Sequence, residues 1–234
     1  MAGRFRPLTQ LVAALGVADP TVAISAGEVE VDGLVNRNPA ARIAATASVR
    51  LRRGQTLRGA VKLNAALDGF AIDVSERIAL DVGAAAGGFT TALLDRGAAR
   101  VYACDAGHGQ LRGHLCQDSR VVNLEGTNVA DLNTHLVPDP LEIVTVDVSY
   151  LSLGSAVAQL GDLRLAPGCA LVGLVKPMFE LGLAVAPTDL GRVAAATSRA
   201  GRAISGAGWT VIGSMPSPTT GARGSVEALL HARF

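Results

Sequence analysis

The chain of 234 residues contains 21 basic side chains, of which only two are lysines, Lys62 and Lys176; the other 19 are arginines. An arginine stays protonated at working pH, whereas a lysine in a medium of low dielectric or near another cation can lose its proton. A chain that uses arginine for nearly all of its positive charge therefore keeps lysine where an amine is needed. This pattern makes both lysines candidates for general-base chemistry.

The second chemical feature is the glycine-rich stretch LDVGAAAGGFT, which runs from Leu80 to Thr90 between an apolar run and a helical pattern. Its spacing is neither that of a dinucleotide-binding turn nor that of a phosphate loop, and a tight bend without a ligand is the alternative. The acid before the first glycine would repel a pyrophosphate but could face a ligand's ammonium group. The next strand ends in Asp105, which could accept both hydroxyls of a ribose.

Together these features favour S-adenosylmethionine over a nicotinamide cofactor. The predicted cofactor contacts are Asp81, Gly83, Ala84, Gly87, Gly88, Asp105 and Asn128.

From about residue 77, apolar strand patterns alternate with helical patterns, which predicts an α/β fold with a mainly parallel, doubly wound sheet. Seven strands are expected, at 77–83, 99–105, 120–125, 141–149, 168–177, 209–215 and 225–234. Helices are expected at 59–70, 88–98, 108–116, 153–163 and 190–208. In such a sheet ligands bind at the carboxyl ends of the strands, where the strand order reverses. The glycine-rich stretch lies at the first such end, so we predict a Rossmann-like fold with a cofactor bound at this turn.

The first 57 residues predict a separate, small α/β module. A helix is expected at 8–16, a hairpin with an Asp-Gly turn at 27–36, and a strand at 47–54. Residues 1–60 hold eight arginines and four acids, whereas the rest holds 13 basic and 16 acidic residues. A basic head of this kind is compatible either with nucleic-acid contact or with an ordinary solvated surface. The candidate RNA contacts are Arg4, Arg6, Arg52, Arg53 and Arg58.

Composition bears on metal binding, membrane anchoring and the cellular compartment. The three cysteines form no C-x-x-C pair, and no cysteine and histidine spacing suggests a metal site. No apolar run approaches the roughly 20 residues that cross a bilayer, and no signal peptide opens the chain. We therefore expect a cytoplasmic protein without a bound metal or a membrane anchor.

Four stretches carry a resemblance to a known family: LDVGAAAGGFTTALLDRGAARVYACDAGHGQL, VDVSYLSL, LVKPMFELG and PSPTTGARGSVEALL. They resemble the TlyA family of hemolysin-like ribosomal RNA 2′-O-methyltransferases. The resemblance is specific over residues 62–180, fainter in the first 57, and resumes from residue 215. It implies an S4 RNA-binding domain at 1–57, an FtsJ-type methyltransferase domain at 58–234, and S-adenosylmethionine as methyl donor. The family's Lys-Asp-Lys-Glu catalytic tetrad falls on Lys62, Asp147, Lys176 and Glu227.

These four residues suit methyl transfer to a ribose hydroxyl, which is a poor nucleophile until its proton is removed. We expect Lys176 to act as the base, with Lys62 favouring its neutral form by charge repulsion and orienting the hydroxyl. Asp147 would position the amines, and Glu227 would hold the far side of the site. Positioning of the two reactants would supply much of the rate.

The sequence departs from the family where RNA would be gripped. The stretch VADPTVAISAGEVEVDG, at the place of the S4 helix, has no basic residue and contains Pro20, which we expect to interrupt the helix. The loop after KPMFELG is short. Two alternatives to an enzyme acting on ribosomal RNA or ribosomal subunits therefore stay open: a methyltransferase of the same fold acting on a small molecule, and a non-enzymatic RNA-binding or membrane-active protein.

Overall fold

The computed structural model describes residues 5–17, 19–25, 27–51, 57–185, 187, 189–221 and 224–234. It divides into two compact units. One contains residues 1–55 together with 112–118, and the other contains residues 56–111 and 119–234. Each unit has a hydrophobic core of its own.

Among its described residues, the small unit has two antiparallel sheets, one of two strands in the order β1-β4 and one of three in the order β3-β2-β5. The expected hairpin turns at Asp32 and Gly33, whose φ angles of +51° and +83° suit the tight Asp-Gly turn. Its elements are β1 (Phe5–Pro7), α1 (Leu8–Ala13), α2 (Pro20–Ser25), β2 (Val29–Val31), β3 (Leu34–Val35), β4 (Arg42–Ala44), β5 (Val49–Leu51) and α5 (Gly113–Cys116).

Our expectation that Pro20 interrupts a helix is wrong. Pro20 is the first residue of α2, where its missing N–H costs nothing and its fixed φ suits the helix. The Asp19 carboxylate caps this start, because its Oδ1 accepts the N–H groups of Thr21 (3.0 Å) and Val22 (3.1 Å). The helix buries Ala23 and Ile24 in the core of the small unit.

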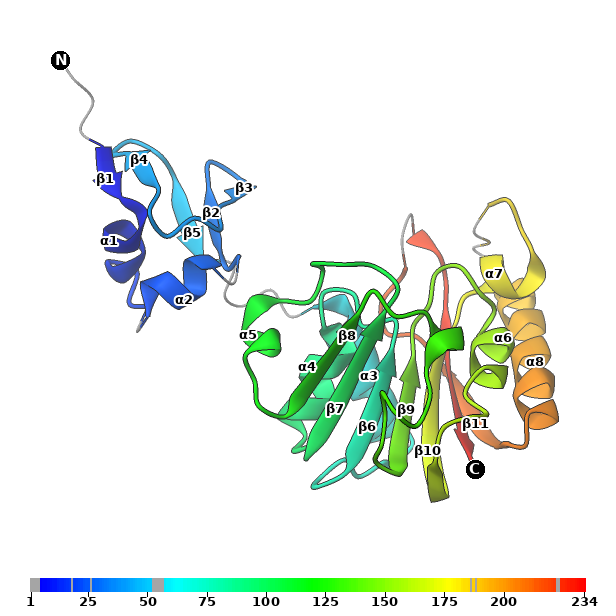
Figure 1. Cartoon of the computed structure of the whole chain (residues 1–234). Helices are drawn as coiled ribbons and strands as arrows, with labels where there is room; N and C mark the ends of the chain where they lie inside the picture. Colours follow the sequence, from blue (N-terminus) through cyan, green and yellow to red (C-terminus); the bar gives the residue numbers. More distant parts are fainter. Residues whose placement is uncertain are drawn as a thin grey trace. The chain divides into compact units, whose positions relative to one another are not determined.

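The larger unit is built on a seven-stranded sheet within the described residues (Figure 1). All neighbouring pairs from β10 to β8 run parallel, and β12 runs antiparallel to both of its neighbours. In their order across the sheet the strands are β11 (Thr210–Pro216), β12 (Ala228–Arg233), β10 (Leu165–Val175), β9 (Leu141–Val146), β6 (Ile78–Val82), β7 (Arg100–Asp105) and β8 (Val121–Glu125).

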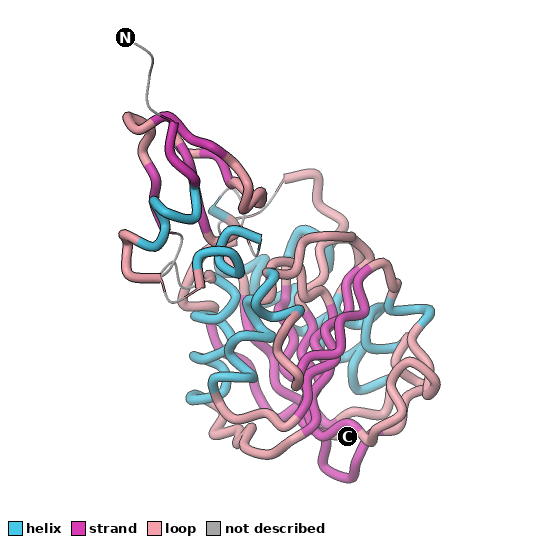
Figure 2. Tube along the Cα trace, turned by 60° about the vertical axis from the view of Figure 1, so that its left-hand side comes forward, coloured by secondary structure: helices cyan, strands magenta, loops and turns pink. Residues whose placement is uncertain are grey.

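Helices cover both faces of this sheet, as Figure 2 shows for the larger unit. Helices α3 and α4 contact each other, and α6 and α8 form a second contacting pair. The apolar faces of the strands and helices bury a continuous core that includes Leu80, Val144, Leu171 and Ile204. The helices are α3 (Arg58–Gly69), α4 (Gly88–Asp95), α6 (Leu153–Ala158), α7 (Pro177–Leu181) and α8 (Leu190–Gly206), with a short 3-10 turn at Val129–Asp131.

The helix expected at 108–116 is much shorter than predicted, because only Gly113–Cys116 is helical. Residues ahead of it form a loop instead, in which the N–H groups of Gln110 and Leu111 donate to the Glu125 carboxylate (2.6 and 2.9 Å). The short helix belongs to the small unit, where His114 Nδ1 lies 3.1 Å from Glu28 Oε1. Tertiary contacts therefore override the helical apolar spacing here.

Candidate active site

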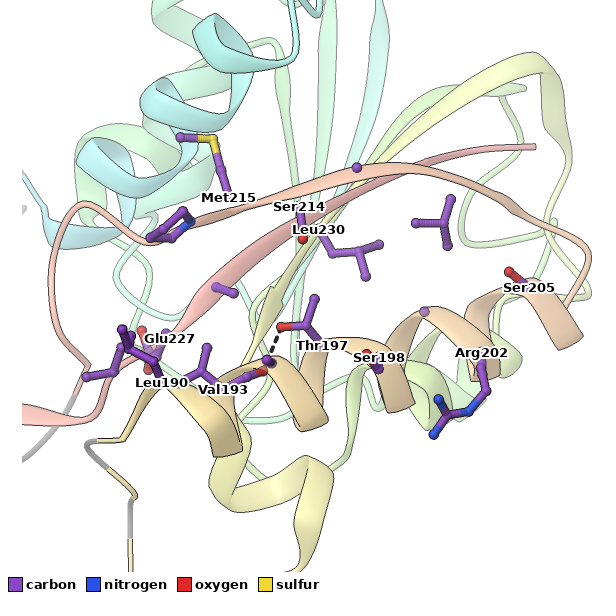
Figure 3. A pocket seen from close by; sticks show the side chains of 17 residues that line it. Leu190, Val193, Thr197, Ser198, Arg202, Ser205, Ser214, Met215, Glu227 and Leu230 are labelled. Carbon is purple, nitrogen blue, oxygen red and sulfur yellow. Dashed lines mark hydrogen bonds between the residues drawn. The ribbon is translucent and has the colours of Figure 1, made fainter.

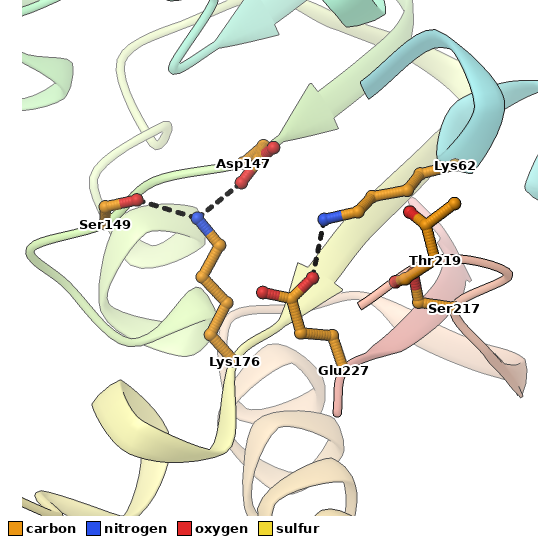
Figure 4. Close-up of polar contacts among 7 residues, drawn as sticks. All are labelled: Lys62, Asp147, Ser149, Lys176, Ser217, Thr219 and Glu227. Carbon is orange, nitrogen blue, oxygen red and sulfur yellow. Dashed lines mark hydrogen bonds and ion pairs between the residues drawn. The ribbon is translucent and has the colours of Figure 1, made fainter. Parts of the chain in front are cut away.

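Four charged side chains from distant parts of the sequence meet as two ion pairs (Figure 4). Lys176 Nζ lies 2.5 Å from Asp147 Oδ1, and Lys62 Nζ lies 2.6 Å from Glu227 Oε2. Lys62 comes from α3, Asp147 follows β9, Lys176 is the N-cap of α7 after β10, and Glu227 precedes β12. The parallel strands end at one edge of the sheet, so residues that follow them come together there.

The two pairs differ in their exposure to solvent. The side chains of Lys62 and Glu227 are 8% and 4% exposed, whereas those of Lys176 and Asp147 are 15% and 23% exposed. Removing either member of a buried ion pair is costly, because it leaves an uncompensated charge in low dielectric. Lys176 is the more accessible of the two amines.

Two cavities adjoin these pairs and share Gly83, Ala85 and Asp147 in their linings. The first, of about 300 Å³, we call the acceptor cavity; both lysines, Glu227 and Arg58 line it. The second, of about 310 Å³, we call the cofactor cavity; its walls include Cys104, Asp105, Gly107, Thr127, Val129, Val148, Ser149 and Tyr150. Asp147 therefore stands where the two cavities meet.

Glycines let the backbone come close together around the acceptor cavity. Gly83 has a φ of +86°, and a Cβ on it would lie 2.5 Å from the Asp147 carbonyl oxygen. A Cβ on Gly88 would lie 3.0 Å from the Cα of Gly59, so the start of α4 packs directly against α3. That contact places the helix that carries Lys62 beside the glycine-rich turn. Larger residues at these positions would push the walls of the site apart.

Comparison with known proteins identifies the family. Residues 56–234 match the model of the FtsJ-like methyltransferase family. The chain is 39% identical over 227 residues to a Mycobacterium tuberculosis protein named 16S/23S rRNA (cytidine-2′-O)-methyltransferase TlyA, which covers 90% of this chain and 81% of that protein. The chain belongs to the TlyA family of FtsJ-like methyltransferases. The predicted class of enzyme is therefore confirmed.

Two further relatives carry a hemolysin name. Hemolysin A of Brachyspira hyodysenteriae is 34% identical over 217 residues, which cover 89% of this chain and 90% of that protein. A solved structure of a hemolysin-type protein from Streptococcus thermophilus superposes with a TM-score of 0.72 at 28% identity, and the match covers 99% of this chain and 89% of that one. The predicted Rossmann-like sheet is thus shared with this family as well as visible in the chain itself.

In this TlyA-family chain, Asp105 ends β7 and lines the cofactor cavity, as a ribose-binding acid should. Its carboxylate also organises the loops around it: Oδ2 accepts the N–H of Ala85 (2.8 Å), and Oδ1 accepts the N–H of Gly107 (2.7 Å). These bonds fix the direction of the carboxylate before any ligand arrives. Each oxygen keeps a second lone pair that a hydroxyl could reach.

Asp81, expected among the cofactor contacts, is held by two threonine hydroxyls. It is fully buried and lines neither cavity. Its oxygens accept the hydroxyls of Thr90 (2.7 Å) and Thr145 (2.9 Å), which ties α4 and β9 to β6. Burial raises the pKa of Asp81 to about 6, against the opposing effect of these hydrogen bonds. We infer that Asp81 stabilises the strand that leads into the glycine-rich turn.

The remaining predicted cofactor contacts lie around the glycine-rich turn and the rim of the cofactor cavity. Gly87 adopts a left-handed conformation (φ +89°) as the N-cap of α4, and Ala84 and Gly88 line the acceptor cavity. Asn128 lines neither cavity, but its Oδ1 accepts the hydroxyl of Tyr150 (3.2 Å) and so holds that ring at the mouth of the cofactor cavity.

Two contacts that sequence reasoning missed support Lys176. Its Nζ donates to Ser149 Oγ (2.8 Å) as well as pairing with Asp147. Glu180, in the helix that Lys176 caps, is buried and accepts the N–H of Leu153 at 2.5 Å, which joins α7 to α6. Burial raises the pKa of Glu180 above its usual range. The sequence KPMFELG places Glu180 four residues after Lys176 but does not predict its hydrogen bond to Leu153, because that partner is 27 positions away.

The predicted RNA contacts are only partly visible. Arg6 is exposed on β1 of the small unit, and Arg58 lines the acceptor cavity at the start of α3. Arg4, Arg52 and Arg53 lie outside the described residues.

A larger groove, of about 1030 Å³, lies between α8 and strands β11 and β12 (Figure 3). Its walls are mainly apolar, and along α8 the Thr197 hydroxyl is occupied by the carbonyl of Val193 (2.9 Å). Glu227 borders both this groove and the acceptor cavity. No lysine lines the groove, whereas both ion pairs border the acceptor cavity, which makes that cavity the candidate active site.

Within the described ranges, no three side chains of the metal-ligating kinds gather closely enough to hold an ion. Over the same residues, none of the helices combines the length and the apolar character that crossing a membrane requires.

Proposed function

We propose that this chain transfers a methyl group from S-adenosylmethionine to a ribose 2′-hydroxyl of ribosomal RNA. The names of the relatives and the family support the substrate. The observation that carries the proposal is the position of Lys176: it lines the acceptor cavity and pairs with Asp147, the residue at which the two cavities meet. A ribosomal substrate also implies work in the cytoplasm.

The cofactor cavity suits S-adenosylmethionine. The preoriented carboxylate of Asp105 would accept the ribose hydroxyls, and the apolar walls of Val129 and Val148 with the ring of Tyr150 would take the adenine. The turn at Gly83 lets the backbone approach the methionine part closely. When bound, the cofactor supplies an electrophilic methyl group on a positively charged sulfur.

The acceptor cavity would hold the ribose. In its neutral form, Lys176 Nζ would take the proton of the 2′-hydroxyl as the oxygen forms its bond to the methyl group. Asp147 would keep the amine in place and stabilise the ammonium that results. The junction of the cavities would hold the hydroxyl and the methyl donor in line, and this orientation would contribute to the rate acceleration.

We propose that the other pair, Lys62 and Glu227, positions the acceptor hydroxyl. Lys62 Nζ donates to Glu227 Oε2 in a buried ion pair, so this carboxylate fixes the position of the amine. We propose that Lys62 presents its remaining N–H groups to the acceptor hydroxyl and that Arg58, on the same cavity wall, contacts a backbone phosphate.

We further propose that residues 1–57 form an S4-like RNA-binding domain and residues 58–234 the methyltransferase domain. The arginines of the first part, including the exposed Arg6, would contact phosphates. Helix α2 contributes no basic residue to such a surface, so binding rests on the arginines of the strands and on those outside the described residues.

The test measures transfer of a labelled methyl group to purified small and large ribosomal subunits over a salt series, with Lys176→Arg as the inactive control. We expect transfer to a subunit at low salt that weakens steeply as salt rises, because each phosphate contact releases counterions. Absence of transfer to either subunit at low salt, with cofactor bound and a small hydroxyl compound methylated instead, would refute the ribosomal substrate and support the small-molecule alternative.

A further inference from the structure

The amine of Lys176 has two acceptors, and only one belongs to the expected tetrad. Asp147 Oδ1 lies 2.5 Å from Nζ and Ser149 Oγ lies 2.8 Å from it (Figure 4). Asp147 and Ser149 stand at alternate positions of the segment after β9, and both side chains reach the same amine. Val148 between them is only 6% exposed and packs into the core, which agrees with that alternation.

In the ion pair the Lys176 ammonium carries three N–H groups; one donates to Ser149 Oγ, and Asp147 Oδ1 lies close to the amine as its counter-charge. A neutral lysine side chain carries two N–H groups and one lone pair at Nζ. When the amine is neutral, the hydrogen bond to Ser149 directs one N–H and the charge of Asp147 attracts the other, so the lone pair is left for the remaining direction. Lys176 lines the acceptor cavity, so that direction is where a substrate hydroxyl would lie.

We propose that Ser149 is a positioning residue that fixes the rotation of the Lys176 amine, so that its lone pair faces the acceptor hydroxyl. Without Ser149, the amine could turn about its Cε–Nζ bond and offer an N–H group to the hydroxyl in place of the lone pair. The hydroxyl proton passes to Nζ as the oxygen–methyl bond forms and the methyl–sulfur bond breaks, with the electron pair of that bond left on sulfur as a neutral thioether. Ser149 itself exchanges no proton. This inference rests on the proposed role of Lys176 as the base.

Ser149 also lines the cofactor cavity, which offers a competing role as a ligand of the cofactor. The two roles affect different kinetic constants. A residue that orients the base affects kcat and leaves the KM values for cofactor and RNA nearly unchanged. A residue that only binds the cofactor raises the KM for S-adenosylmethionine and leaves kcat at saturation unchanged.

The experiment measures kcat and both KM values for Ser149→Ala and Ser149→Thr on ribosomal subunits. Loss of one neutral hydrogen bond should lower kcat about three- to tenfold in the alanine variant. Threonine keeps the hydroxyl, and Ser149 is exposed enough to accommodate its methyl group, so kcat should largely recover. The matched control is Ser152→Ala. It removes the cap of α6, where Ser152 Oγ accepts the Ser155 N–H (3.1 Å), and a hydrogen bond with Ser155 Oγ (2.8 Å); its kcat should equal that of wild type.

Three results would overturn the inference: wild-type kcat in Ser149→Ala, a raised cofactor KM with unchanged kcat, or no recovery in Ser149→Thr. A kcat loss in Ser152→Ala matching that of Ser149→Ala would overturn it too, because the effect would then be a general loosening of the loop. The variant Lys176→Arg distinguishes failure of the positioning role of Ser149 from failure of Lys176 as the base. If that variant is inactive while Ser149→Ala is normal, only the positioning role fails; if it is active, the proposed base itself fails.

Discussion

Replacing Glu227 by glutamine should destabilise the larger unit severely. The change keeps the shape of the side chain but leaves the Lys62 ammonium, whose side chain is 8% exposed, without its partner at 2.6 Å. Removing one member of a buried ion pair typically costs about 3–5 kcal/mol, since the remaining charge stays in low dielectric. The penalty here belongs near the lower end of that range, because Lys62 lines a cavity that water can enter.

The assay is urea unfolding followed by the fluorescence of Trp209, the one tryptophan of the chain. Trp209 is 4% exposed and packs edge to face against Phe234, so its emission reports on the larger unit. With a urea slope of about 2 kcal/mol per molar, a loss of about 3 kcal/mol lowers the midpoint by roughly 1.5 M. The free energy of unfolding is compared with that of wild type in the same buffer.

Two variants make the result specific. Asp68→Asn removes an exposed ion pair with Arg96 (2.7 Å) and should leave the midpoint close to that of wild type, because surface pairs contribute little. The double variant Lys62→Met with Glu227→Leu removes both buried charges and should recover most of the stability. A loss below about 1 kcal/mol in Glu227→Gln would refute the argument that this pair is desolvated.

Three further predictions concern other parts of the site. Gly83→Ala should abolish cofactor binding in calorimetric titration, because its Cβ would lie 2.5 Å from the Asp147 carbonyl oxygen; Gly161→Ala, with open space around it, should bind normally. Lys176→Arg should lower turnover about a hundredfold or more with cofactor affinity nearly unchanged, and near-normal turnover would exclude it as the base. Asp81 has a pKa of about 6 in the folded state and 3.8 in the unfolded state, so the folded state binds its proton more tightly. The free energy of unfolding should therefore fall by up to about 3 kcal/mol as the pH rises from about 4 to 6. Urea unfolding over this pH range should show no such fall in Asp81→Asn, and an unchanged fall in that variant would contradict the raised pKa.

Local patterns predicted most of the larger unit. The apolar run and glycines of residues 78–88 form β6 and the turn into α4 as expected, and the alternation of strands and helices produced the mainly parallel sheet. The helix expected at 108–116 failed because backbone N–H groups there are taken by Glu125 instead of by a helical turn. The expected interruption at Pro20 does not occur, because a proline disrupts a helix only at interior positions and is well suited to the first position, where Pro20 lies in α2.

Residue type alone was enough to single out Lys62 and Lys176, since the scarcity of lysine is a property of composition. How the four charged residues pair was decided only by the tertiary structure. Lys62 and Glu227 are 165 positions apart, and they meet because α3 packs on α4 and β12 inserts between β10 and β11. The inward direction of Asp81 depends likewise on Thr145, 64 positions away. Sequence patterns act over a few residues through backbone preference and periodicity, whereas side-chain partners across a sheet depend on which strands become neighbours, and only the folded core determines that.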